Sequence, residues 1–569
     1  MSSTATVFIL CIISQVVLGG NIYSDDHYMH PNFKRHVQNK QDPPFEDAEF
    51  WRKNAQDDLA KELLKQPIEA QAKNVILFLG DGMSIPTVTA ARIFKGQKVD
   101  GLPFGEEGQL HMDTFPFSGT SKTFCMDTQV ADSACSATAY LCGTKGRIGT
   151  IGVTSNVMIF QCAKQADPAN HVSSVLAWAQ AQGKSTGIVT TTGVTHASPA
   201  GTYAHAAFRS WESDADVRLG LGDPKVCEDI ATQLIKREPG ININVILGGG
   251  RRHFTPFTQN DTEYPDEKGH RLDGVNLIDE WISMKNSSRG RYVSGRDQLL
   301  TVDPAETDYL LGLFAPSHVS YYDQQLANND PTLEEMTEVA IKILSKNPNG
   351  FFLFVEGGRI DHSHHNNAPQ KAMWETIEFD KAIKKGDDMT EDDDTLIVTT
   401  ADHSHVMYFA GYPDRGTPIW KHSSDLALDG LPYSTLGYAN GGNRNWLDET
   451  TNKRHNISQD NMDDLNYNPP VPVPMIDSES HGGDDVAIFA KGPFAHLLTG
   501  VHQQSYIPHV IGYAACIGTG LGSLKMGSIG PPPTTRRGYS PECNLNFHMG
   551  YHFTGNFTTK LTSSIFLTS

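Results

Sequence analysis

Short apolar segments alternate with amphipathic segments along most of this chain, and the alternation limits the folds open to it. The apolar segments span residues 74–79, 185–191, 243–247, 351–355, 395–398 and 486–490. Segments with helical spacing lie between many of them, including residues 172–182 and 333–344. Strands that alternate with helices form a mostly parallel sheet covered by helices on both faces. We therefore predict an α/β fold with a large, mostly parallel central sheet.

Other parts of the chain depart from this pattern. Residues 45–64 have helical spacing and precede Pro67, so they predict a separate N-terminal helix. Residues 411–474 are rich in Gly, Pro, Asn and Tyr, which predicts a small irregular insertion of turns and short strands. The predicted divisions are a leader over 1–20, a core over 21–410, the insertion over 411–474, a return of the core over 475–525 and a flexible tail over 526–569.

The N-terminus and the sequons predict an extracellular protein. Residues 7–13 and 16–18 are apolar and precede Gly19-Gly20, as in a secretory signal peptide, although no Lys or Arg comes before them. The alternative is a cytosolic N-terminus. No later segment is long and apolar enough to span a bilayer. Four N-x-S/T sequons are candidate glycosylation sites: Asn260, Asn286, Asn456 and Asn556.

The net charge limits the binding partners of the protein, and the cysteine content limits its disulfides. The formal net charge of −20 argues against a nucleic-acid partner, because such proteins concentrate Lys and Arg. It does not exclude a small anionic substrate, since bound cations can invert the local field. Of the eight cysteines, Cys11 lies in the predicted leader, which leaves an odd number and therefore at least one free or intermolecular thiol. Two or three disulfides are expected in an oxidising compartment.

Two Asp-His-Ser-His blocks, residues 361–364 and 402–405, each follow an apolar segment. We expect one strand to bring Glu356, Asp361 and His365 to one place and a second strand to bring Asp402 and His403 beside them. Carboxylate and neutral imidazole are the ligands of catalytic zinc. Two neighbouring metal ions suit phosphoryl transfer, because together they stabilise the attacking and leaving oxygens.

Polar side chains also follow several of the predicted strands. A single aspartate after a strand is more often a cap or turn residue than a ligand, but four such positions make coincidence a weak explanation. In a parallel sheet these ends meet at one edge, where ligands bind. The residues concerned are Asp81, the pair His196 and Ser198, Glu356, and Asp402 with His403.

Residues 132–139 read D-S-A-C-S-A-T-A and place Ser133 at the start of an Ala-rich helical segment. The free N–H groups and the dipole at a helix N-terminus favour an anion. A serine hydroxyl becomes a good nucleophile only beside a base or a metal. No Ser-His-Asp set is evident in the sequence, so we expect a metal. The alternative is that Asp132 or Ser133 only caps the helix.

These features, together with F-L-G-D-G-M (78–83), T-H-A-S-P-A-G-T-Y-A-H (195–205) and E-S-H-G-G-D-D-V (479–486), resemble the alkaline phosphatase family over roughly residues 43–516. The animal branch is the most similar. His196 and His362 stand where that branch carries histidines near the metals. The resemblance implies a homodimer that hydrolyses small phosphate monoesters through a phosphoserine, with two zinc ions and one magnesium ion.

The resemblance also implies a role for each matching residue. Arg209 would bind two phosphate oxygens, and Asp132 would orient Arg209. The implied ligands are Asp361, His365 and His481 for the first zinc, Asp81, Asp402, His403 and Ser133 for the second, and Asp81, Ser198 and Glu356 for magnesium. A calcium site is possible at Glu263, the carbonyl of Phe314 and Asp330, but Ala315 replaces a usual glutamate ligand.

The family pattern further implies disulfides Cys142–Cys227 and Cys516–Cys543, contact between partners through the helix at 45–64, and a crown-type region at 411–474. Cys135 is expected to be a buried apolar residue and not a catalytic thiol. Residues 560–569 carry only four apolar side chains, too few for the tail that a glycolipid anchor replaces. We expect a secreted form, with a GPI-anchored form as the alternative.

Other function classes are weaker. A sulfatase would need Cys or Ser in a C/S-x-P-x-R context, which Ser133 lacks. Phosphodiesterases of this fold commonly use Thr and lack the magnesium ligands. A non-enzymatic phosphate- or metal-binding protein would be favoured by loss of a ligand or of Ser133, and none is lost.

Overall fold

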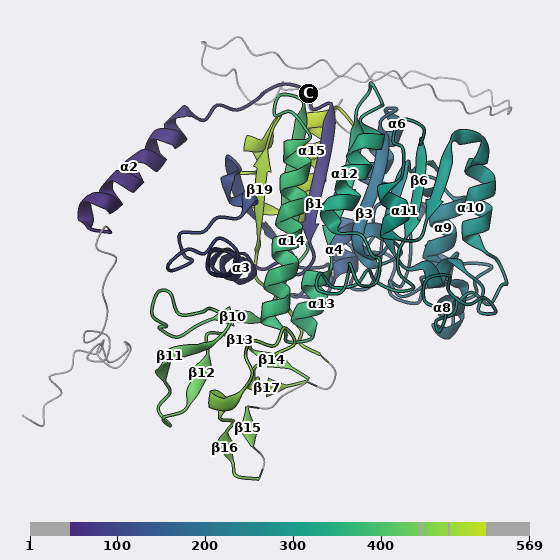
Figure 1. Cartoon of the computed structure of the whole chain (residues 1–569). Helices are drawn as coiled ribbons and strands as arrows, with labels where there is room; N and C mark the ends of the chain where they lie inside the picture. Colours follow the sequence, from purple (N-terminus) through teal and green to yellow (C-terminus); the bar gives the residue numbers. More distant parts are fainter. Residues whose placement is uncertain (1–45, 443–445, 449, 476–477, 519–569) are drawn as a thin grey trace, which may run out of the picture. The chain divides into compact units, whose positions relative to one another are not determined.

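A computed structural model of the protein describes residues 46–442, 446–448, 450–475 and 478–518 (Figure 1). Its centre is a ten-stranded sheet. In sheet order the strands are β20 (Gly500–Gln503), β2 (Phe117–Lys122), β19 (Val486–Lys491), β8 (Thr395–Ala401), β1 (Asn74–Gly80), β7 (Phe351–Gly357), β3 (Ser185–Gly193), β4 (Val245–Gly249), β6 (Tyr309–Leu313) and β5 (Gly290–Val293).

The sheet is mostly parallel, as predicted. β1 pairs in parallel with both β7 and β8, and β3, β4, β6 and β5 continue in the same direction. β19 runs antiparallel to its two neighbours, β8 and β2. Every residue of β1, β7 and β8 is buried, which explains why each strand contains a continuous apolar run in place of alternating apolar and polar residues.

Successive residues of β1 face opposite sides of the sheet, and each side has its own hydrophobic core. Val75 and Leu77 belong to the same hydrophobic core as residues of α4, α6, α7, α9, α10 and α15. Ile76 and Phe78 belong to a second core with residues of α3, α11, α12, α13 and α14. The predicted covering of both faces is therefore confirmed.

The helices have the following bounds: α2 Ala48–Leu64, α3 Ile85–Lys98, α4 Ser133–Cys142, α5 Cys162–Gln165, α6 Val175–Ala181, α7 Ala197–Ala200, α8 Asp214–Leu219, α9 Ile230–Lys236, α10 Leu277–Lys285, α11 Arg296–Leu300, α12 Leu333–Leu344, α13 Arg359–His365, α14 Pro369–Asp388 and α15 Ile507–Ala515.

Short strands gather beside α13 in Figure 1, and most of them lie within residues 411–474. They form five two-stranded sheets. The pairs are β10 (Met407–Phe409) with β13 (Leu436–Tyr438), β11 (His422–Leu426) with β12 (Pro432–Ser434), β14 (Asn440–Gly441) with β17 (Val473–Pro474), β15 (Leu447–Asp448) with β16 (Lys453–Arg454), and β18 (His481–Gly482) with β9 (Ser404–His405).

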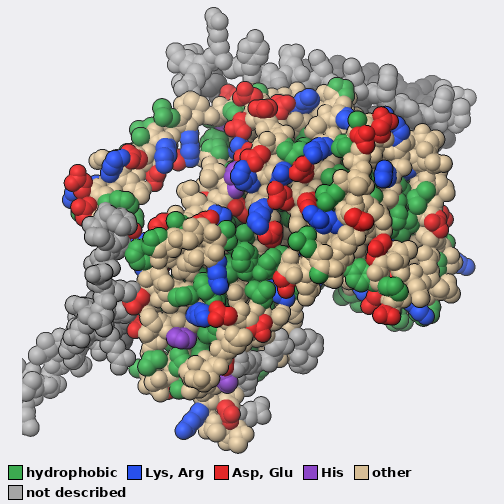
Figure 2. All heavy atoms as spheres, viewed as in Figure 1, with side chains coloured by type: hydrophobic (Ala, Val, Ile, Leu, Met, Phe, Trp, Pro, Cys, Tyr) green, Lys and Arg blue, Asp and Glu red, His purple; other side chains and the backbone are tan. Residues whose placement is uncertain are grey.

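The sequence did not predict four strands of the main sheet, β2, β5, β6 and β20. β2 and β20 are polar and lie at one edge, and β5 has only four residues. Acidic and basic side chains are interspersed over the face seen in Figure 2, despite the net charge of −20. The predicted leader, the tail, Cys543 and Asn556 lie outside the described residues.

Candidate metal centre

The carboxyl ends of β1, β7 and β8 meet at one edge of the main sheet and present acidic side chains there. Gly80, the last residue of β1, pairs with Ala401, the last residue of β8. Asp81 and Asp402 come next in the chain, so the strand register sets the two residues side by side. Glu356 lies in β7, on the other side of β1. All three carboxylate residues are completely buried.

Asp81, Asp402 and His403 form one compact group of possible metal ligands. Nε2 of His403 lies 3.0 Å from Oδ2 of Asp402 and 3.6 Å from Oδ1 of Asp81. The backbone N–H of Gly82 donates to Oδ1 of Asp402 at 2.9 Å. Oγ of Ser133 lies 3.2 Å from Nε2 of His403. The serine hydroxyl therefore adjoins this group of ligands.

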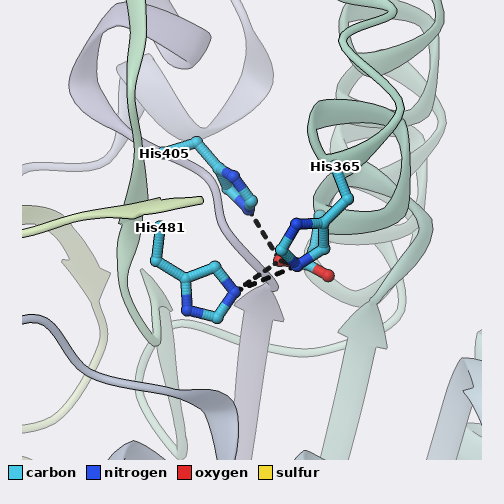
Figure 3. Close-up of side chains that lie close together, drawn as sticks. His365, His405 and His481 are labelled. Atoms are coloured by element: carbon cyan, nitrogen blue, oxygen red, sulfur yellow. Dashed lines mark hydrogen bonds and ion pairs between the residues drawn. The ribbon is translucent and has the colours of Figure 1, made fainter. Parts of the chain in front are cut away.

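Asp361, His365, His405 and His481 form a second group. The three imidazole rings converge on one point (Figure 3). Nε2 of His365 and Nε2 of His481 are 3.1 Å apart. Oδ1 of Asp361 lies 3.5 Å from the first of these nitrogens and 3.4 Å from the second. Three ligand atoms thus surround a volume that a single cation could occupy.

The rings of His365 and His481 are oriented by their other nitrogens. Nδ1 of His365 lies 2.6 Å from the carbonyl oxygen of Glu479. Nδ1 of His481 lies 2.8 Å from the carbonyl oxygen of Ala131. Because a carbonyl only accepts, each Nδ1 carries a proton, and Nε2 is the nitrogen of the neutral ring that can offer a lone pair. Metal-binding histidines have this arrangement.

Asp361 and His365 lie on a helix, α13, and not on a strand as the sequence analysis expected. The i,i+4 spacing of the two residues puts them on one helix face. That spacing was visible in the sequence, but the apolar run before it favoured an extended strand. The strand ends at Gly357, one turn earlier.

His405, the last residue of the second block, was missed by the sequence analysis. Its Nε2 lies 2.6 Å from Oδ1 of Asp361, and its Nδ1 lies 2.5 Å from Oε2 of Glu479. Burial alone would lower the pKa of His405, but these two carboxylates raise it to about 10. His405 therefore bridges them as a cation. Gly82, at φ +66°, lies against its ring, where a Cβ would approach to 2.4 Å.

A third group combines Asp81, Glu356 and His196. Oε2 of Glu356 accepts hydrogen bonds from the hydroxyls of Thr190 and Thr192. Oε1 of Glu356 and Oγ of the nearby sequence-predicted ligand Ser198 have no hydrogen-bond partner. Burial raises the pKa of Glu356 to about 7.

The electrostatics of these groups fit bound cations. Neither carboxylate oxygen of Asp81 has a hydrogen-bond partner. Burial raises the pKa of Asp81 well above its usual range, and the neighbouring carboxylates, Asp402 first, raise it further. Removing an unpaired charge from water costs several kcal/mol, so the carboxylates of such a cluster are ionised together only with compensating positive charge. Divalent cations would supply that charge, and oxygen and imidazole donors suit zinc and magnesium.

Ser133 begins α4, and Asp132, Arg209 and His196 lie beside it, with Arg209 in contact with the other two. Asp132 caps α4 through the N–H of Cys135 at 3.2 Å. Nη1 of Arg209 donates to Oδ2 of Asp132 at 3.1 Å. Nη2 of the same guanidinium lies 2.9 Å from Nε2 of His196. The structure thus brings together the serine, the arginine and the carboxylate that the sequence singled out.

His362, predicted to lie just outside the metal ligands, adjoins the same region. Its ring centroid is 5.7 Å from that of His196. Nη1 of Arg359 lies 3.0 Å from its Nδ1. Burial lowers the pKa of His362 well below its usual value, so the ring is neutral.

The predicted calcium ligands lie apart from these groups. Oε1 of Glu263 accepts from Ser294 at 2.7 Å, and Oδ2 of Asp330 accepts from the N–H of Ser320 at 2.9 Å. Phe314 and Ala315 are buried. Among the described residues, no cluster of three possible side-chain metal ligands includes Glu263 or Asp330.

The predicted Cys142–Cys227 disulfide is wrong. Cys227 is bonded to Cys162, with a Cα–Cα distance of 5.3 Å, and Cys142 is a buried free thiol within α4. Cys135 is buried, as expected, but is bonded to Cys125. The family resemblance implied the wrong partner, and spacing in the sequence could not correct it, because the fold decides which cysteines meet. Cys516–Cys543 stays a prediction.

Three predicted glycosylation sites, Asn260, Asn286 and Asn456, are exposed. Among the described residues, no helix combines the length and the apolar character needed to cross a membrane.

Comparison with known proteins identifies relatives over most of the chain. A family model described as alkaline phosphatase matches residues 72–517. An alkaline phosphatase of Gadus morhua is 48% identical over 477 residues, which cover 83% of this chain and 98% of that protein. The tissue-nonspecific isozyme of Homo sapiens is 47% identical, covering 84% and 90%. The membrane-bound alkaline phosphatase of Bombyx mori is 45% identical, covering 83% and 86%.

Solved structures share the fold. The alkaline phosphatase of the Antarctic bacterium TAB5 superimposes with a TM-score of 0.52 at 21% identity, covering 79% of this chain and 99% of that one. The Thermus thermophilus enzyme gives a TM-score of 0.54 at 20% identity, covering 78% and 92%. At these identities the likeness extends to the fold alone.

Proposed function

Since this chain belongs to the alkaline phosphatase family and is a hydrolase of phosphate monoesters, we propose that it works through a phosphoserine on Ser133, two zinc ions and one magnesium ion. The observation that carries the proposal is the meeting of two ligand groups beside one hydroxyl. Ser133 adjoins His403, and the ring of His403 stacks on that of His481 with centroids 3.6 Å apart. Two cations held there would lie close together, as two-metal phosphoryl transfer requires.

We assign the ligand residues to the three ions from the groups in which they lie and from the ligand atoms that they offer. When bound, the ions neutralise the buried carboxylates, lower the pKa of the serine hydroxyl and of a water molecule, and stabilise charge on the transferring phosphoryl group. The proposed ligands are Asp361, His365 and His481 for the first zinc, Asp81, Asp402, His403 and Ser133 for the second, and Asp81, Ser198 and Glu356 for magnesium.

The side chains of the protein position the phosphate and receive it. The guanidinium of Arg209 binds two phosphate oxygens and is held by Asp132 and His196. The hydroxyl of Ser133 loses its proton to solvent, and its Oγ forms a bond to phosphorus while the bond to the alcohol oxygen breaks. The alcohol oxygen takes up a proton from solvent as it leaves. A water molecule then displaces Ser133, which gives inorganic phosphate and restores the hydroxyl. All of these groups contact the phosphate and none contacts the alcohol part of the substrate. We therefore expect the enzyme to accept many different phosphate monoesters.

Hydrolysis of a chromogenic phosphate monoester at alkaline pH tests the proposal. We expect Ser133→Ala and chelation each to abolish most of the activity, and intact-mass measurement at low pH to detect a phosphate adduct in the wild type alone. Ser283→Ala, an exposed serine on α10, is the matched control and should remain active. Full activity in Ser133→Ala or after chelation would contradict the mechanism.

We further propose a homodimer joined through α2, with residues 21–410 and 475–525 as the catalytic core around a crown-type region at 411–474. We also propose an extracellular, glycosylated enzyme that is secreted or held at the cell surface. The exposure of the three described sequons supports this location, and one relative is itself described as membrane-bound. Calcium at Glu263, Phe314 and Asp330 stays a proposal, with Ala315 expected to weaken it.

A further inference from the structure

A separate cluster of possible metal ligands lies outside the centre described above. Asp216 of α8, His253 of the 3-10 helix Arg251–Phe254 and His270 each offer one ligand atom, and these atoms lie within 4.8 Å of one another. Three segments that are distant in the sequence therefore converge on one point. Neither the sequence motifs nor the proposed mechanism uses these residues.

The environment of the His253 side chain indicates that an ion binds there. Its side chain is 4% exposed, and its Nδ1 has no hydrogen-bond partner. Oδ2 of Asp216 lies 3.4 Å from this nitrogen. A buried polar atom without a hydrogen bond is costly and uncommon. A cation between Nδ1 and the carboxylate would compensate for the missing hydrogen bond.

The other ring nitrogen of His253, Nε2, lies near a carboxylate, as the outer nitrogen of a metal-binding histidine usually does. Oε2 of Glu212 lies 3.4 Å from Nε2, and the hydroxyl of Thr195 donates to Glu212 at 2.6 Å. A carboxylate that accepts from the outer nitrogen fixes the ring and strengthens the inner nitrogen as a ligand. In the structure Nε of Arg252 donates to Nε2 of His253 at 3.3 Å, so Arg252 would have to turn away when Nε2 donates to Glu212.

The local charge and the fixed position of the Asp216 side chain also favour a bound cation. Two carboxylates, Glu212 and Asp216, face one guanidinium, that of Arg252, so the local balance is negative. Asp216 is held in place because it closes the N-terminus of α8 by accepting from the N–H and hydroxyl of Ser213, at 2.9 and 2.6 Å. Burial and the nearby Arg252 lower the pKa of His270, which keeps that ring neutral and able to bind a metal.

We propose that Asp216, His253 and His270 bind a zinc-class divalent ion, with Glu212 positioning His253. Two imidazole nitrogens and one carboxylate oxygen suit zinc, whereas calcium and magnesium take oxygen ligands. Three protein ligands leave one position for water.

The ion would cross-link the loop that carries Arg209. Glu212 lies three residues beyond Arg209, and Thr195 adjoins His196, which contacts the Arg209 guanidinium at 2.9 Å. The site is therefore connected to the phosphate-binding arginine but does not include it.

Zinc counting on the full-length protein tests the proposal. After equilibration with zinc and magnesium followed by dialysis, we expect the wild type to retain one more zinc per chain than the double variant His253→Gln/His270→Gln. Glu212→Gln should weaken zinc binding at this site by about 10- to 100-fold. The matched control is His422→Gln/His502→Gln, which removes two histidines outside every ligand cluster of the described residues and should match the wild type.

Equal zinc content in the wild type and the double variant would overturn the proposal, however many ions the catalytic centre holds. Because the comparison is a difference between two proteins, it does not depend on the proposed catalytic stoichiometry. Anomalous diffraction at the zinc edge from wild-type crystals avoids any folding defect of the variants. A peak among Asp216, His253 and His270 supports the site, and absence of a peak there overturns it.

Discussion

At the scale of single residues, burial outside the catalytic groups sets a pH dependence of stability. Glu375 of α14 is buried, and burial raises the pKa of its carboxyl to about 7, although the N–H of Tyr322 and the charge of Arg359 act in the opposite direction. Between the unfolded pKa of about 4.3 and the folded value, the folded protein holds this proton more tightly than the unfolded chain does. The free energy of unfolding should therefore fall as pH rises through this window.

Glu375→Gln should remove that decline. In the wild type the N–H of Tyr322 donates to Oε1 of Glu375 at 2.9 Å. Glutamine keeps an oxygen that can accept this hydrogen bond, but its side chain cannot ionise. Relative to the wild type, the variant should gain up to about 3 kcal/mol between pH 4.5 and 8. Denaturant unfolding at several pH values, with metal concentrations held fixed, measures this difference. A difference that stays constant with pH would contradict the assignment.

Residue types and strand-end positions predicted part of the candidate site, and His481 and Arg209 were predicted only through the family resemblance. Asp81, Glu356 and Asp402 follow or end apolar runs, and a parallel sheet must bring such ends together. His405 and Glu479 could not be predicted in the same way. They touch Asp361 or each other only because the short strands β9 and β18 pair, and that pairing has no periodicity in the sequence. The Cys142–Cys227 pairing, which the family resemblance implied, was wrong because the fold brings Cys227 to Cys162.

At the scale of elements, the N-terminus of α4 links a helix cap to Arg209, the proposed phosphate-binding residue. Asp132 accepts from the N–H groups of Cys135 and Gly149 and also holds Arg209. Asn keeps the capping oxygen but loses the charge, whereas Ala loses both. Asp132→Ala should cost about 1 kcal/mol of stability, and Asp132→Asn much less. Both should lower kcat/KM and weaken inhibition by inorganic phosphate by roughly 10- to 100-fold.

Thermal unfolding and phosphate inhibition measured on the same proteins separate the two roles. Ser174→Ala is the matched control, because Ser174 caps α6 through the N–H of Ala177 without touching Arg209. It should lose stability and keep its affinity for phosphate. If Asp132→Asn binds phosphate as tightly as the wild type, Asp132 serves only as a cap.

The elements that the sequence predicted well are those with strong local patterns. α12 has its predicted bounds, because Thr332 and Glu335 form a capping box before an amphipathic run. β1, β3, β7 and β8 were found because both of their faces are buried. β2 and β20 are partly exposed and polar, and they exist only through pairing at the sheet edge, which is a tertiary effect.

At the scale of the whole molecule, the packing within one chain does not explain why α2 is a stable helix. None of its 17 residues is buried, and its apolar side chains are largely exposed, with Trp51 at 52%, Leu63 at 73% and Leu64 at 79%. A helix of this length without tertiary packing is marginal in water. The proposed homodimer would bury these side chains, so a chain that begins at Lys65 should be monomeric, whereas the full chain is dimeric. Sedimentation velocity or light scattering after size exclusion measures the mass.

Removal of a whole helix can act through stability alone, so point variants give the sharper test. Serine replacements on its apolar side chains should dissociate the dimer, whereas the same number on its charged side chains should leave the dimer intact, because exposed ion pairs contribute little. Equal masses for the two proteins would mean that the partners meet elsewhere. The apolar set is Trp51→Ser, Leu59→Ser, Leu63→Ser and Leu64→Ser, and the charged control set is Lys53→Ser, Asp57→Ser, Asp58→Ser and Lys61→Ser.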